Sequence, residues 1–185
     1  MKPDITREFT SMLNRVNLCA AIFAPMLMVH FQEADCCIDL RAVVLQQSSE
    51  LQKIAEWTAV QSGLRATTSL PRLELRSPAE LAAIRYGGSP VQMGADIIAL
   101  YDPASRTILL SKNWQGTKTA AFSVIVHEMV HHLQQENGKR YGCVQEQEEQ
   151  AFAAQDAWLA ENGSSLEKEF GIDPFTRLVA SLCPY

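Results

Sequence analysis

The run His127-Glu128-Met129-Val130-His131 constrains the fold more than any other feature of this chain. Residues four apart lie on one face of an α-helix, so the two imidazoles can reach a single zinc ion. Glu128 would lie beside the ion, where a carboxylate can take a proton from a zinc-bound water and pass it to a leaving amine. The motif therefore predicts a helix that carries a zinc site and a general base.

The residues around the motif favour a buried helix over a chance match. Thr117 or Thr119 can begin this helix as an N-cap, and Asn137-Gly138 is a typical C-cap. Three of the four histidines of the chain lie in this segment. Apolar residues recur along it at helical spacing, namely Phe122, Val126, Met129 and Leu133.

A catalytic zinc site needs a third protein ligand and a position left open for water. The extended metzincin pattern is absent, because Gln134 and Asn137 stand where it requires a glycine and a third histidine. The remaining histidine, His30, lies far upstream. We therefore expect a carboxylate from a second helix. Segment 143–159 is rich in Glu, Gln and Ala, and it follows a short loop that allows an antiparallel arrangement.

Three glutamates of that segment are candidate ligands: Glu146, Glu148 and Glu149. Glu148 would share a helix face with Ala151, whose small side chain allows the two helices to approach closely. The E-x-x-A stretch from Glu148 resembles the E-x-x-A-D stretch of integral-membrane gluzincins of the CAAX-processing kind, in which the first Glu binds zinc. This resemblance implies that Glu148 is the third ligand.

The resemblance is incomplete at one position. Phe152 stands where those gluzincins have Asp, so another residue must orient a ligand histidine. Gln155 and Asp156 are the candidates for this role. Three further residues could assist zinc by stabilising an oxyanion: Tyr141, His132 and Arg140. His132 is not expected to be a zinc ligand, because it is turned about 100° from its neighbour on the helix.

The rest of the chain predicts an α+β fold. The expected elements are a helix over 40–61, a strand over 70–76, a helix over 77–85 with a capping box, strands over 95–101 and 106–111, a capping box from Ser164 to Glu167, and a last helix opened by Asp173-Pro174. Their order is that of a minimal zincin-like domain, in which a small twisted sheet with a hairpin packs on the HExxH helix and a second helix carries a metal ligand.

The hairpin region adds a second resemblance. Tyr101-Asp102-Pro103, Ile108-Leu109-Leu110 and Trp114, together with the zinc helix, resemble a group of small bacterial proteins with an HExxH gluzincin-like domain. The resemblance covers residues 40–160 and implies a zinc hydrolase fold. In such folds the outer strand binds an extended peptide by strand addition, and strand 95–101 or 106–111 would take this role.

The composition sets limits on organisation and location. The net charge is −5 and no Lys/Arg cluster is present, which disfavours nucleic-acid binding. Residues 18–31 are uncharged and apolar, too short for a stable membrane span but typical of a signal-peptide core. We expect residues 1–34 to be a signal peptide or an N-terminal apolar segment, and 35–185 to be one zincin-like metallohydrolase domain. Export to the periplasm or the medium is the first expectation, and a cytoplasmic or membrane-surface location is the alternative.

Cysteine usage agrees with export. Outside the expected leader, the chain has Cys36, Cys37, Cys143 and Cys183. A Cys143–Cys183 disulfide would tether the C-terminal tail to the start of the second ligand helix. We favour this pairing.

Taken together, the residues predict a zinc-dependent metallopeptidase that acts on a peptide or protein. One Zn²⁺ per chain would be held by His127, His131 and Glu148, with Glu128 as the general base. Two alternatives remain at this stage. One is a non-catalytic zinc-binding or partner-binding module on the same fold, and the other is a zinc hydrolase of a non-protein amide.

Overall fold

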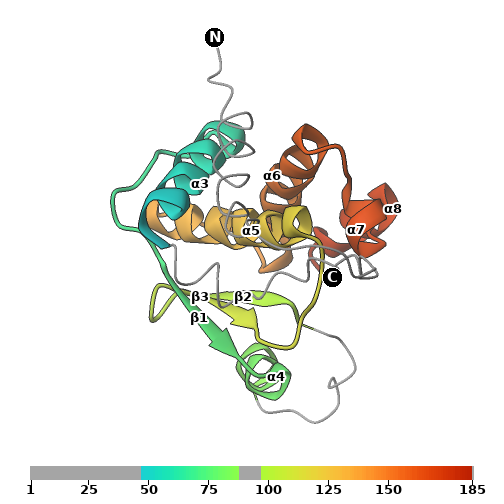
Figure 1. The fold of residues 1–185 in the computed structure, drawn as a ribbon, viewed down its shortest axis with the longest axis horizontal. Coiled ribbons are helices and arrows are strands. Elements are labelled where there is room, and N and C mark those ends of the chain that lie inside the picture. The colour runs from blue at the N-terminus through green and yellow to red at the C-terminus, as the bar shows by residue number, and fades with distance from the viewer. Residues whose placement is uncertain (1–46, 88–96, 185) are drawn as a thin grey trace, which may run out of the picture. The chain divides into compact units, whose positions relative to one another are not determined.

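A computed structural model of the chain describes residues 47–87 and 97–184 (Figure 1). The chain divides into the units Met1–Cys36 and Cys37–Tyr185, and every described residue belongs to the second. The elements, in order, are α3 (Gln47–Ser62), β1 (Arg72–Arg76), α4 (Pro78–Tyr86), β2 (Ala99–Asp102), β3 (Thr107–Ser111), α5 (Lys118–Glu136), a 3₁₀ turn (Gln145–Gln147), α6 (Glu148–Glu161), α7 (Leu166–Phe170) and α8 (Pro174–Ala180). The expected leader over 1–34 lies outside the described residues.

The three described strands form one mixed sheet in the order β1-β3-β2, so the predicted α+β fold is confirmed. β1 pairs with β3 in parallel, and β2 pairs with β3 antiparallel. β3 is buried along its whole length. Because β3 has a neighbour on both sides, strand 106–111 cannot be the outer strand, and that alternative is wrong. β2 pairs on only one side within the described part of the chain.

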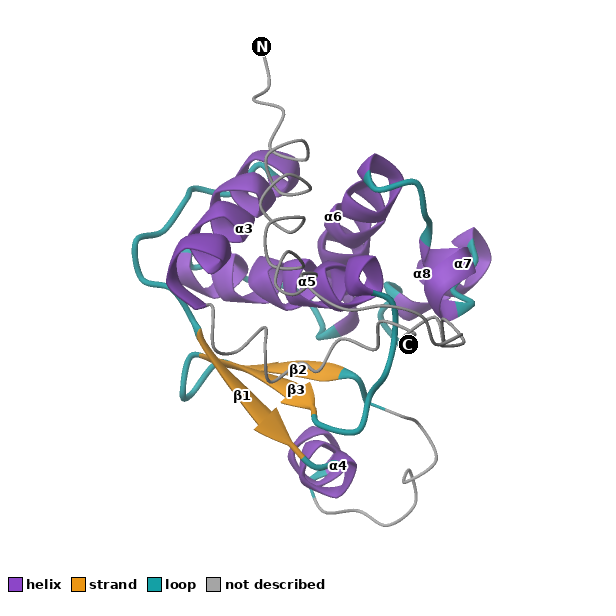
Figure 2. Ribbon diagram, in the orientation of Figure 1, coloured by secondary structure: helices purple, strands orange, loops and turns teal. Residues whose placement is uncertain are grey.

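α5 is the central element of this unit. It packs against the sheet on one side and against α3 and α6 on the other (Figure 2). Its residues are buried almost all round, and Met129 and Leu133 have no exposed surface. A helix with apolar residues on all sides is stable only when it is enclosed in this way. The ring centroids of Trp57 and Trp158 lie 5.0 Å apart, edge to face, and join α3 to α6.

The ends of the helices follow local signals. Thr117, rather than Thr119, is the N-cap of α5, and its hydroxyl accepts a hydrogen bond from the Ala120 amide at 3.1 Å. Asn137 is the C-cap, and Gly138 follows with φ 63°, a left-handed conformation that glycine adopts without strain. The predicted capping box of α4 is confirmed at Ser77 and Glu80.

The predicted capping box from Ser164 to Glu167 is wrong, because the N-cap lies one residue later than expected. Ser165 is the N-cap of α7, and its hydroxyl accepts from the Lys168 amide at 3.2 Å. The Ser164 hydroxyl instead donates to Glu169. Two adjacent serines offer the same hydroxyl group, so the local sequence did not distinguish the two registers. At α8, Asp173 is the N-cap, as predicted.

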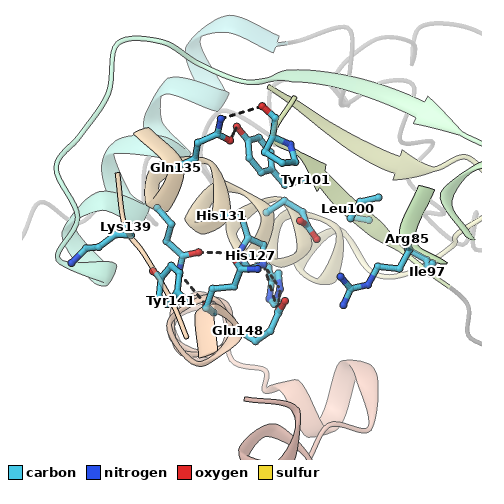
Figure 3. A pocket seen from close by; sticks show the side chains of 15 residues that line it. Arg85, Ile97, Leu100, Tyr101, His127, His131, Gln135, Lys139, Tyr141 and Glu148 are labelled. Atoms are coloured by element: carbon cyan, nitrogen blue, oxygen red, sulfur yellow. Dashed lines mark hydrogen bonds and ion pairs between the residues drawn. The ribbon is translucent and has the colours of Figure 1, made fainter. Parts of the chain in front are cut away.

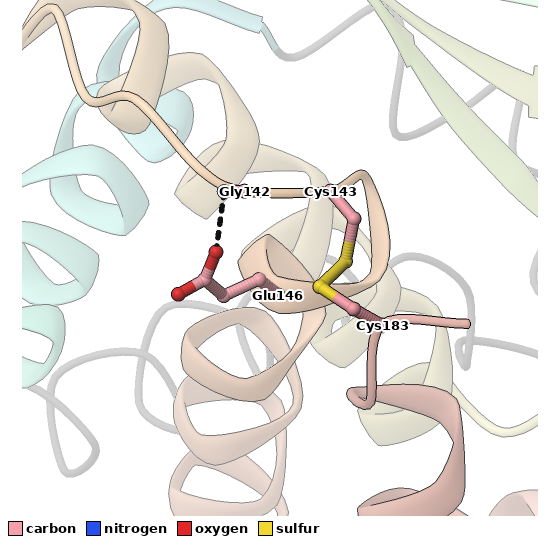
Figure 4. The surroundings of a disulfide bond; sticks show 4 residues. All are labelled: Gly142, Cys143, Glu146 and Cys183. Atoms are coloured by element: carbon pink, nitrogen blue, oxygen red, sulfur yellow. Dashed lines mark hydrogen bonds between the residues drawn. A yellow bond between two sulfur atoms is a disulfide. The ribbon is translucent and has the colours of Figure 1, made fainter. Parts of the chain in front are cut away.

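The disulfide between Cys143 and Cys183 is present, which confirms the favoured pairing (Figure 4). It tethers the residues after α8 to the segment just before α6, across a sequence separation of 40. The tether therefore spans the segment that carries Glu148. Among the described residues, no helix has the length and apolarity needed to cross a bilayer.

Loss of this disulfide is expected to lower the free energy of unfolding by about 2–4 kcal/mol, because the unfolded chain regains the freedom of the loop. Urea denaturation of the oxidised protein with and without reductant measures the difference. The Cys143→Ser/Cys183→Ser double variant is the control, since reductant should not shift its midpoint. Equal midpoints for the oxidised and reduced wild-type protein would contradict a stabilising role.

Candidate metal centre

Three side-chain atoms from two helices converge on one point: His127 Nε2, His131 Nε2 and Glu148 Oε2. The two Nε2 atoms are 3.3 Å apart, and they lie 3.1 and 3.5 Å from Glu148 Oε2. A tetrahedral ion with bonds of about 2.0–2.1 Å would place its ligand atoms about 3.3–3.4 Å apart. The observed spacings match this value. These residues form a group that could hold a metal ion.

The two helices position these ligands by simple spacing. His127 and His131 stand one turn apart on α5, and Glu148 is the first residue of α6. Ala151, one turn further along α6, is fully buried in the packed unit. Its small side chain is compatible with a close approach of α6 to α5, which brings a short carboxylate within reach of both imidazoles.

A glutamine forms a hydrogen bond with each imidazole on the side away from the cluster. His127 Nδ1 lies 3.0 Å from Gln155 Oε1, and His131 Nδ1 lies 3.0 Å from Gln134 Oε1. An amide oxygen can only accept, so each Nδ1 carries a proton, and in the neutral imidazole each Nε2 then keeps a free lone pair directed at the cluster. Both ring tautomers are thereby set for metal binding.

Of the two candidates for orienting a histidine, Gln155 has this contact. Asp156 instead accepts a hydrogen bond from the Leu166 amide at 3.2 Å. Phe152 packs its ring on His127, with centroids 4.9 Å apart. The sequence reasoning missed Gln134, although its position three residues after His131 places it on a neighbouring turn of the same helix.

The supporting glutamines are themselves held in place. Gln155 Nε2 donates to the Ser123 hydroxyl at 3.3 Å, and Gln134 Nε2 donates to the Gln147 carbonyl at 3.0 Å. Both glutamines are buried. Buried polar groups with satisfied hydrogen bonds have little freedom to move, so the imidazoles are fixed before any ion binds.

The charges of the cluster are coupled. Burial would raise the pKa of the Glu148 carboxyl, but hydrogen bonds from His127 and His131 in their protonated form, in which both ring nitrogens carry a proton, outweigh this effect and hold the pKa well below its usual range. Burial would lower the pKa of His131, yet the hydrogen bond to Glu148 and the nearby Glu128 charge raise it. An ionised Glu148 is the form that binds a cation.

The cluster faces a cleft of about 430 Å³ that is also lined by Glu128 and by residues of β2 (Figure 3). The Glu128 residue is 7% exposed. The other two candidate ligands lie elsewhere: Glu149 is exposed, and Glu146 accepts a hydrogen bond from the Gly142 amide (Figure 4). Neither of them lines the cleft.

The three candidate oxyanion stabilisers are placed differently. Tyr141 lines the cleft, burial raises the pKa of its hydroxyl, and the hydroxyl donates a long hydrogen bond of 3.5 Å to Gln150 Oε1. Arg140 is exposed and does not line the cleft. His132 is fully buried, with Nε2 2.6 Å from the Ser69 carbonyl and Nδ1 3.0 Å from the Tyr101 hydroxyl. Its hydrogen bonds therefore join α5 to the sheet.

Comparison with known proteins gives one result. The model of a family described as Domain of unknown function (DUF6647) matches residues 44–172, which include every residue of the cluster and of the cleft. No curated protein and no solved structure matches the chain.

Proposed function

We propose that this chain, which belongs to the DUF6647 family, is a zinc-dependent metallopeptidase of the gluzincin type. The observation that carries the proposal is the convergence of His127, His131 and Glu148, with Glu128 in the same cleft. A site that served only to hold a metal would have no need for a second, unliganded carboxylate there. Two imidazoles and one carboxylate ligand are one of the established ligand sets of catalytic zinc, and a neighbouring carboxylate can serve as the base.

The donor set favours zinc among common metals. Two imidazole nitrogens and one carboxylate oxygen at tetrahedral spacing suit Zn²⁺, whereas Mg²⁺ and Ca²⁺ prefer oxygen ligands in larger number. A zinc ion held by these residues would polarise the substrate carbonyl and make a water acidic enough to act as a nucleophile near neutral pH.

Glu128 supplies the proton transfers in this proposal. It follows His127 directly on α5 and lines the cleft beside the cluster. Its carboxylate takes a proton from the attacking water and later delivers it to the nitrogen of the leaving amine. Because the residue is largely buried, its charge acts in a medium of lower dielectric constant than water. Tyr141 is the hydroxyl donor best placed to support the oxyanion.

β2 provides a surface for an extended peptide. The Ser111 amide donates to the Ile98 carbonyl at 2.8 Å, so the backbone of Ile98 points toward β3. Pairing alternates along an antiparallel ladder, and the backbone groups of Ala99 and Tyr101 therefore point to the unpaired side. These two residues line the same cleft as the cluster. A substrate strand added there would lie alongside the metal ligands, and its backbone would be held whatever its side chains are.

Export is part of this proposal. The Cys143–Cys183 disulfide supports it, since such bonds persist in oxidising compartments and are rare in the cytosol. The expected leader over 1–34 would direct the chain to the periplasm or the medium.

Metal analysis and a peptide library test the proposal. Purified protein reconstituted with zinc is expected to hold about one Zn²⁺ per chain and to cleave members of the library. Removing the ion with 1,10-phenanthroline should abolish cleavage, and adding zinc back should restore it. Stoichiometric zinc without cleavage of any peptide would instead favour a non-catalytic zinc module. A protein that binds no zinc would defeat the proposal.

A further inference from the structure

An arginine in the cleft has no part in the chemistry described above. Arg85 lines the cleft from the last turn of α4, and Figure 3 shows its guanidinium directed toward His127 and Glu148. Its side chain is exposed, and no ion pair joins it to a carboxylate among the described residues. Within residues 47–87 and 97–184, no carboxylate neutralises the charge that Arg85 presents to the cleft.

The helix that carries Arg85 is well anchored. Ser77 and Glu80 form a reciprocal capping box at its start, and Leu81 is fully buried. Gly87 ends the helix in a left-handed conformation, φ 61°, with its amide bonded to the Ala83 carbonyl. The backbone of α4 is thus fixed at both ends, so the base of the Arg85 side chain lies at a defined edge of the cleft.

The other charged residues of the cleft are either engaged or directed elsewhere. Glu148 belongs to the ligand cluster, and Glu128 carries the proton transfers proposed above. Lys139 also lines the cleft, but Figure 3 shows its ammonium directed away from the cluster. With a divalent ion bound, the cleft would carry an excess of positive charge, which attracts anionic groups of a substrate.

The direction of β2 tells which end of a peptide would meet Arg85. Ile97, two residues before the strand, lines the cleft next to Arg85 (Figure 3), and Pro103 follows the last residue of the strand and also lines the cleft. A peptide added antiparallel to β2 would bring its C-terminal end to Ile97. A parallel peptide would set its terminal ammonium beside the guanidinium, and parallel pairing is also slightly less stable per residue.

We propose that Arg85 binds a carboxylate of the substrate on the C-terminal side of the cleaved bond. This inference rests on the proposed peptidase function. A guanidinium fits a carboxylate with two parallel hydrogen bonds, which gives both orientation and charge recognition. The carboxylate comes either from the free C-terminus of a short peptide or from an acidic side chain near that end.

Three matched peptide libraries distinguish these sources: one with free C-termini, one amidated, and one amidated with an acidic residue at varied positions. The wild-type protein is expected to cleave the carboxylate-bearing sets about tenfold better, in kcat/KM, than the neutral amides. Arg85→Gln should remove this preference, and Arg85→Lys should restore part of it. Lys139→Gln, which removes an equal charge from the same cleft, is the matched control and should keep the preference.

A binding measurement separates this inference from the peptidase proposal. Zinc-loaded Glu128→Gln protein is expected to bind free-acid peptides with a Kd about tenfold lower than that of their amides. The Arg85→Gln/Glu128→Gln protein should bind acids and amides with equal Kd. If nothing is cleaved but this difference in retention is seen, the peptidase proposal fails and the carboxylate site stands. If acids and amides are cleaved and retained equally, or if Arg85→Gln keeps the preference, the role of Arg85 is overturned while the peptidase proposal survives.

Discussion

Glu128→Gln is expected to lower the rate of peptide hydrolysis by about 10²–10⁴-fold while the protein still binds zinc normally. Gln has the shape of Glu but cannot take a proton from the attacking water. Glu128 is not one of the three clustered ligands, so its replacement leaves the donor set complete. The measurement is kcat/KM on a cleaved library peptide, with zinc content determined on the same sample.

Glu136→Gln is the matched control for this substitution. Glu136 lies on the same helix, but it pairs with Arg106 at 3.0 Å and does not line the cleft. Its substitution removes the same charge and should leave kcat/KM unchanged. If Glu128→Gln cleaves as fast as the wild type, the activity comes from another base or from a contaminant, and the proposed mechanism is wrong.

Glu148→Gln is expected to weaken zinc binding by more than about 100-fold, the upper range for residues that only support a ligand. A neutral amide loses the charge that attracts the ion, and it is a poorer donor than a carboxylate oxygen. Competition with a chromophoric chelator measures the affinity. The structure offers a close control in Glu149→Gln, which alters the adjacent residue of the same helix by the same charge.

Glu149 is exposed and lies outside the cluster, so Glu149→Gln should bind zinc as the wild type does. The opposite ranking of the two variants would show that Glu149 reaches the ion and that α6 is rotated from the position described above. If Glu148→Gln and Glu149→Gln both bind zinc almost as tightly as the wild type, neither glutamate is the third ligand.

Structural features that depend only on residues close together in the sequence could be predicted from the sequence. The central helix with its C-cap, the capping box at Ser77 and the Asp173 cap each depend on residues within a few positions of one another. The five-residue motif also placed both histidines on one face of α5, because helical geometry alone sets that spacing. The Cys143–Cys183 pairing, chosen from few alternatives, was also predicted correctly, although it joins residues far apart in the sequence.

Contacts between segments far apart in the sequence were decided by the packing of the folded chain. Neighbouring helical positions differ by about 100° in direction, so the rotation of α6 about its own axis decides whether Glu148 or Glu149 faces α5. The sequence pattern did not show that β3 is central and β2 is the edge, because strand order depends on how β1 crosses over to reach its partner. Gln134 and Arg85 line the cleft because of the elements that pack around them, and the sequence pattern did not show that packing either.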